Sequence, residues 1–223
     1  MVFGFSLFGC ESDEIRALNK AQACMDEVPA DNPSVAGQCF AYVEKYSSQQ
    51  ANILKCSIKL TEGGLGTDKI VDAYKVSKDD SLSGSQKQVA YLGALTLSSY
   101  ALAQEAYGYC VLSEISGLKF IGGLAQISSM LGTAYDPGNP SGSIAAIESA
   151  LNGCVTGSSC DMAATGAIVA DLSDTYCANP TSDQEVCSDI NQAIDAAGGD
   201  AELAARQFMC QLQNKTYVAG SCQ

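Results

Sequence analysis

The chain has 223 residues, 47% of them apolar, which is enough hydrophobic material to bury a core. Its formal charge of −13 comes from 25 acidic and 12 basic residues, and this balance disfavours nucleic acid and anionic lipid headgroups as partners. The absence of histidine excludes Ser-His-Asp and Cys-His nucleophiles, histidine-ligated zinc and an imidazole general base.

Helical periodicity dominates the chain from residue 12 onward. Apolar residues recur every three or four positions between turns rich in Gly, Pro and Ser, and we find no strand-like alternation of any length. The expected helices are 12–28, 34–46, 48–62, 67–77 and 84–107, broken helices over 111–134, and four short helices near 143–153, 160–176, 183–197 and 200–214. The most apolar stretch, 89–103, is shorter than the roughly 20 residues that a bilayer requires. The pattern predicts an all-α fold of antiparallel helical hairpins, packed as a bundle or a short α-solenoid.

The segment 136–142 is rich in turn-forming residues and is the clearest linker. It predicts an N-terminal helical domain over 11–135 and a C-terminal disulfide-rich subdomain over 143–223, preceded by a short signal segment at 1–10. The acidity is concentrated in the second half, because residues 121–223 hold eleven acidic residues against two basic ones.

Cysteine usage indicates the compartment. The cysteines are Cys10, Cys24, Cys39, Cys56, Cys110, Cys154, Cys160, Cys177, Cys187, Cys210 and Cys222. No C-x-x-C pair occurs among them, which disfavours a zinc site and a thioredoxin-like redox motif. Eleven scattered cysteines favour structural disulfides, and therefore the periplasm, the cell surface or the extracellular medium. We expect no cofactor and no bound metal.

Eleven is an odd number, so one cysteine is left over. Setting Cys10 aside leaves ten, enough for five bridges. Neighbours across turns suggest the pairs Cys24–Cys39, Cys154–Cys160, Cys177–Cys187 and Cys210–Cys222, which leaves Cys56 with Cys110. Sequence alone does not determine this connectivity.

The tetrapeptide Leu7-Phe8-Gly9-Cys10 closes an apolar run that begins at Val2, and an acidic spacer follows it. It resembles the lipobox of bacterial lipoproteins, in which a small residue precedes the cysteine that is diacylated and becomes the first residue after cleavage. The resemblance implies a lipid anchor on Cys10 and attachment to the outer membrane. The alternative is that residues 2–9 begin a buried helix and that Cys10 pairs with another thiol.

A second resemblance covers residues 58–74. A Leu and a Gly near the end of one helix precede an Ala-aromatic pair on the next, formed by Leu60, Gly63, Ala73 and Tyr74. This is similar to part of a tetratricopeptide repeat, which implies an α-solenoid with a concave face for a peptide or protein. The alternative is an ordinary α-hairpin. In either case we expect the helix over 67–77 to present Ile70, Ala73, Tyr74 and Val76 on its buried stripe.

Candidate catalytic residues are few. Asp171 and Asp174 share one helix face and are the only paired carboxylates that suggest a hydrolase, although such a pair is also typical of a solvated surface. The leading hypothesis is therefore a non-enzymatic envelope lipoprotein, a helical scaffold that binds protein partners. The alternative is a soluble periplasmic or secreted all-α protein that binds a small apolar ligand in an enclosed cavity.

Overall fold

The structure is a computed structural model that describes residues 12–157, 159–179 and 184–223. In these residues the helices are α1 (Asp13–Asp26), the 3₁₀ helix η1 (Pro33–Cys39), α2 (Phe40–Val43), α3 (Gln49–Glu62), α4 (Thr67–Ser77), α5 (Gly84–Ala94), α6 (Tyr100–Leu112), α7 (Ser116–Leu131), α8 (Pro140–Thr156), α9 (Met162–Thr175), α10 (Gln184–Ala197) and α11 (Ala201–Gln211). The strands are β1 (Tyr217–Val218) and β2 (Ser221–Cys222), which form one antiparallel hairpin. The expected all-α fold stapled by disulfides is confirmed. None of the helices in the described ranges has the length and apolar character needed to cross a bilayer.

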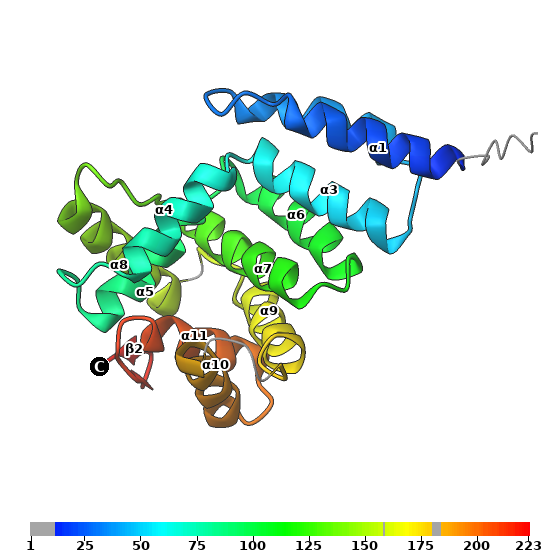
Figure 1. Ribbon diagram of the computed structural model, residues 1–223. Helices are drawn as coiled ribbons and strands as arrows, with labels where there is room; N and C mark the ends of the chain where they lie inside the picture. Colours follow the sequence, from blue (N-terminus) through cyan, green and yellow to red (C-terminus); the bar gives the residue numbers. More distant parts are fainter. Residues whose placement is uncertain (1–11, 158, 180–183) are drawn as a thin grey trace, which may run out of the picture.

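The helices pack as a layered bundle (Figure 1). At one end α1, η1 and α2 cover α3, which packs mainly against α6; α6 in turn packs against α7. On one side α4 packs against α5, and α5 against α8. At the other end α9, α10 and α11 form a compact group that joins the rest through α7 and α8.

Buried residues on both sides of the segment 136–142 belong to one core cluster. Leu92 and Leu124 before the segment share this cluster with Ile147 and Phe208 after it. The segment therefore joins parts of a shared core, and α8 already begins inside it at Pro140.

Side-chain caps set most of the helix starts. The hydroxyls of Ser12, Ser48 and Ser99 accept hydrogen bonds from the backbone N–H three residues on, which satisfies one of the free donors of the first turn. Ser83 and Gln86 form a reciprocal capping box at the start of α5. These signals are local, which is why the starts of α1, α3 and α5 could be predicted within one residue, whereas the start of α6 was missed.

The helix expected over 84–107 is two helices, so this prediction was wrong. The break between α5 and α6 is stabilised by α7: the Thr96 hydroxyl lies 2.5 Å from that of Ser128, and the Leu97 N–H donates to the Ser129 hydroxyl at 2.8 Å. Ser99 then caps α6. The polar groups of this buried connection are thus satisfied by a helix some 30 residues away, which periodicity cannot reveal.

The broken helices expected over 111–134 are one continuous helix, α7, from residue 116 to 131. Gly122 and Gly123 lie in its middle because other elements approach closely there. A Cβ on Gly122 would lie 2.8 Å from the Cys110 sulfur, and one on Gly123 would lie 2.9 Å from Ile168. These glycines allow close packing and do not interrupt the helix.

The helix expected over 34–46 is mostly a 3₁₀ helix, followed by the single turn α2. Pro33 occupies its first turn, where a missing N–H costs least. The expectation of no strands is also corrected by the short C-terminal hairpin, in which Tyr217 pairs with Cys222 and Val218 with Ser221.

Five disulfides connect the helices: Cys24–Cys39, Cys56–Cys110, Cys154–Cys160, Cys177–Cys187 and Cys210–Cys222. These are the pairs that cysteine order suggests, with Cα–Cα separations of 4.8 to 5.6 Å. Multiple disulfides indicate an oxidising, extracytoplasmic compartment.

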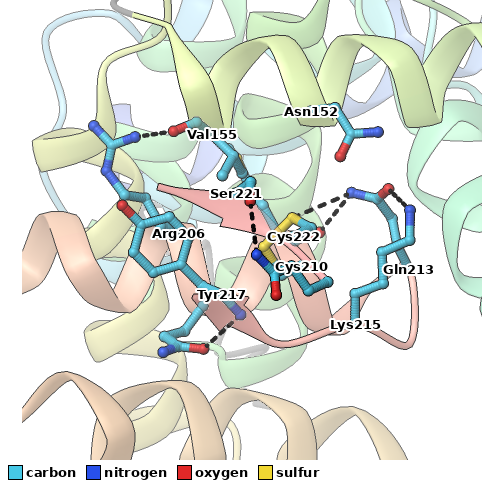
Figure 2. Close-up of a disulfide and its surroundings, with 12 residues drawn as sticks. Asn152, Val155, Arg206, Cys210, Gln213, Lys215, Tyr217, Ser221 and Cys222 are labelled. Carbon is cyan, nitrogen blue, oxygen red and sulfur yellow. Dashed lines mark hydrogen bonds between the residues drawn. A yellow bond between two sulfur atoms is a disulfide. The ribbon is translucent and has the colours of Figure 1, made fainter. Parts of the chain in front are cut away.

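The C-terminal hairpin is held against α11 by the last disulfide (Figure 2). The Tyr217 N–H donates to the Gln207 side chain at 3.3 Å, and the Gln213 amide lies 3.9 Å from the Cys222 sulfur. Close by, the Arg206 guanidinium donates to the Val155 carbonyl at the end of α8. This basic side chain of the acidic half is therefore occupied as a helix C-cap.

Candidate functional site

The largest hollow described is an open groove of about 680 Å³. It runs between the end of α1 with its following turn, the α3–α4 connection, and the start of α7. Its apolar wall residues include Met25, Val28, Pro29, Leu60, Leu65, Ile70, Leu118 and Ile121, with Gln22, Asp26, Thr61, Asp68 and Lys69 among its polar ones. We call this the α1/α4/α7 groove.

The shape of this groove depends on the turn between α3 and α4. The Leu65 N–H donates to the Leu60 carbonyl and the Gly64 N–H to that of Thr61, a Schellman arrangement that ends α3. Gly64 adopts φ +93°, which glycine tolerates without strain. Leu65 and Leu60 are both buried, so they fix the angle at which the chain leaves toward α4.

Large apolar side chains lie exposed on α4 beside the groove. Ile70 is 40% exposed, Val71 44% and Tyr74 61%, whereas Ala73 and Val76 face the core. The expectation that Ile70 and Tyr74 lie on the buried stripe was wrong. Helices α3 and α4, which carry the tetratricopeptide resemblance, have α6 and α5 as their main packing partners.

Two lysines of α3, Lys55 and Lys59, lie beneath α2 and the turn that follows it. Lys55 is buried and donates to the carbonyls of Glu44 and Tyr46 at 2.9 and 2.6 Å, so it holds the chain after α2 against α3. Burial lowers the pKa of Lys55, and the charge of Glu44 opposes this shift. Its ammonium also lies 5.3 Å from the ring centre of Tyr109.

Lys59 lies one turn further along α3 and joins it to α6. Its ammonium lies 3.0 Å from Glu62 and 3.2 Å from Glu105. Burial alone would lower the pKa of Lys59, but the hydrogen bonds and charges of the two glutamates outweigh burial and raise it. Lys59 therefore stays charged at neutral pH as a structural cross-link.

A smaller hollow of about 340 Å³ lies between α1 and α2, next to the beginning of α1. Its lining consists of Asp13, Arg16, Ala17, Lys20, Ala41, Tyr42, Lys45 and Tyr46. We call it the α1–α2 hollow. A third, of about 410 Å³, lies between α4, α5 and the α7–α8 connection, with Lys69, Lys75 and Tyr135 in its lining.

The two candidate catalytic carboxylates both lie on α9 but have different surroundings. Asp171 is half-buried and accepts a hydrogen bond from the Tyr107 hydroxyl at 2.9 Å, whereas Asp174 is exposed. Burial and the bond to Asp171 raise the pKa of Tyr107. Neither carboxylate lines any of the three hollows described above.

Cys10, the expected lipidation site, lies outside the described residues, as does the rest of the lipobox resemblance. Every other cysteine is in a disulfide. Within the described part of the chain, no group of three or more His, Cys, Asp or Glu side chains is arranged to hold a metal ion. Sequence reasoning missed all three hollows, because each is formed by segments that no local pattern connects.

The fold and cysteine chemistry define the class, a disulfide-stapled all-α protein of an oxidising compartment outside the cytoplasm. No protein-family model matches the chain, and no curated protein or solved structure matches it at a significant level.

Proposed function

We propose that this protein is a non-enzymatic scaffold of the bacterial cell envelope, lipid-anchored to the outer membrane through Cys10, and that its α1/α4/α7 groove binds a segment of a protein partner. The observation that carries the binding proposal is the groove itself, about 680 Å³ in volume, with exposed Ile70 on its edge and Val71 beside it. An apolar groove next to exposed large side chains is typical of a surface that receives a helix or an extended peptide.

The anchor proposal is supported by the lipobox resemblance and by the cysteine count. The five disulfides use ten of the eleven cysteines and leave Cys10 without a disulfide partner among them. Acyl chains on Cys10 would each contribute about 0.8 kcal/mol of membrane affinity per buried CH₂.

The alternative, binding of a small apolar ligand, requires an enclosed cavity. The hollow of about 410 Å³ beside Tyr135 has the volume for such a ligand, but it is open to solvent and bordered by Lys69, Asp72, Lys75 and Asp79. The groove therefore supports protein binding better than this hollow supports an apolar ligand.

Site-specific photo-crosslinking in the native envelope tests the binding proposal. A photoreactive phenylalanine analogue replaces Ile70 in the groove or, as a matched control, Val218 in the C-terminal hairpin, which is similarly exposed at 45%. We expect a discrete adduct at position 70 that is lost when Ile121→Glu introduces a charge on the α7 side of the groove. No adduct at position 70, or the same adduct at position 218, contradicts the proposal.

A further inference from the structure

We propose that the α1–α2 hollow binds the anionic phospholipid headgroups of the membrane that carries the protein, so that the acidic C-terminal helices point away from the bilayer. This inference rests on the lipid anchor of the proposed function. It adds a contact surface and an orientation that the anchor alone does not define.

The α1–α2 hollow is lined mainly by basic side chains. Three of the twelve basic residues of the chain line this hollow, Arg16, Lys20 and Lys45, against one acid, Asp13, which is ion-paired to Arg16. The described residues provide no carboxylate partner for Lys20 or Lys45. The hollow is thus a local exception to the acidity of the chain, and a positive surface of this kind attracts anionic headgroups at about 1 kcal/mol per Lys or Arg.

Tyrosine side chains lie beside these charges. Tyr42 is 45% exposed, and the Lys45 ammonium lies 5.0 Å from the ring centre of Tyr46. Tyrosine rings with neighbouring lysines are typical of the headgroup level of a bilayer, where the ring is half-solvated and the amine reaches phosphate. Lys55 holds this turn in place from below through the carbonyls of Glu44 and Tyr46.

The α1–α2 hollow lies close in sequence to the proposed anchor. Cys10 precedes Asp13 by three residues, and three extended residues span at most about 11 Å. A lipid on Cys10 therefore brings the first turns of α1 close to the bilayer surface. These turns carry Arg16 and Lys20 on the α1–α2 hollow, together with Asp13, which is paired to Arg16, and Glu14, which does not line the hollow. The span of about 11 Å between Cys10 and Asp13 is comparable with the screening length of about 8 Å at physiological salt.

The end of the molecule that carries α10 and α11 is acidic. Helices α10 and α11 lie at the end of the molecule opposite to α1 (Figure 1). Residues 184–211, which form these two helices and their connection, hold five acidic residues and one basic residue, Arg206, which caps α8. An anionic surface repels this end, so both ends favour the same orientation.

The test uses a chemical tether, which makes it independent of native acylation. The full oxidised chain is coupled through Cys10 to a maleimide lipid in vesicles of phosphatidylcholine, with or without phosphatidylglycerol. Because the chain has no Trp, the Tyr42→Trp and Tyr74→Trp variants each carry a single fluorescent reporter, one in the hollow and one on α4. Quenching by a headgroup spin-labelled lipid reports contact with the surface.

We expect stronger quenching of the Tyr42→Trp variant than of the Tyr74→Trp variant in phosphatidylglycerol vesicles, and loss of this difference in 1 M salt, where the screening length is about 3 Å. Adding Lys20→Gln and Lys45→Gln should weaken the contact equilibrium about 25-fold, which corresponds to about 1 kcal/mol per lysine. Equal quenching in both lipids, or quenching that these substitutions leave unchanged, overturns the proposal. Either result leaves the anchor itself to be decided separately by the mass of the native protein.

Discussion

Removing the Cys56–Cys110 disulfide should destabilise the protein more than removing the Cys154–Cys160 disulfide. The first joins residues 54 positions apart and the second residues six apart. In the loop-entropy model these separations correspond to about 4 and about 2 kcal/mol. Cys56 and Cys110 are also fully buried, and α7 packs on them at Gly122, so their truncation adds a cavity cost.

Guanidinium unfolding of the two paired alanine variants measures the difference at fixed pH. We expect the variant lacking Cys56–Cys110 to be less stable by at least about 2 kcal/mol, and to melt about 4–8 °C lower than the variant lacking Cys154–Cys160. An equal loss of stability in the two variants would show that the Cys56–Cys110 bridge does not restrict the unfolded chain more than the Cys154–Cys160 bridge, which contradicts this prediction.

Three further outcomes follow from buried contacts. Lys59→Met should destabilise the protein at neutral pH and lose this effect as the pH rises past 10.5. Because the pKa of Lys59 is raised in the folded state, its ion pairs stabilise fully below pH 10.5, and this stabilisation is lost above the folded-state pKa. Urea midpoints of both proteins at about pH 8 and pH 11.5 measure the effect, and a difference that stays constant with pH refutes it. Lys55→Met should cost about 2 kcal/mol and speed amide exchange after α2, since two carbonyls lose a charged donor; protection as in the parent protein argues against this role. Gly166→Ala should cost about 3 kcal/mol because the new Cβ meets the Ala201 backbone. Gly153→Ala should stabilise by about 0.5–1 kcal/mol because no atom lies near its Cβ position. Thermal melts measure both, and shifts of the melting temperature in the same direction contradict this packing.

The all-α fold could be predicted because its signals are local. Ser48 begins one helix and Gly64 ends it, and each acts within four residues along the chain. Disulfide partners could be suggested because four of the five bridges span fifteen residues or fewer.

The features that could not be predicted depend on contacts between segments that lie far apart in the sequence. The break after α5 depends on Ser128 and Ser129, and the continuity of α7 depends on what packs against Gly122. The groove and the α1–α2 hollow could not be predicted for the same reason, because each is lined by several separate segments. Ile70 and Tyr74 match a core stripe in sequence, yet on α4 it is Ala73 and Val76 that are buried in the core. Ile70 and Tyr74 are therefore exposed, and Ile70 lines the groove.

Intact mass spectrometry of the protein purified from its own host, before and after reduction and alkylation, tests the central claim most directly. We expect that no thiol is alkylated before reduction, that ten are alkylated afterwards, and that a chain starting at Cys10 carries diacylglycerol. Free thiols among those ten cysteines would contradict the disulfide framework, and an unmodified Cys10 would contradict the anchor.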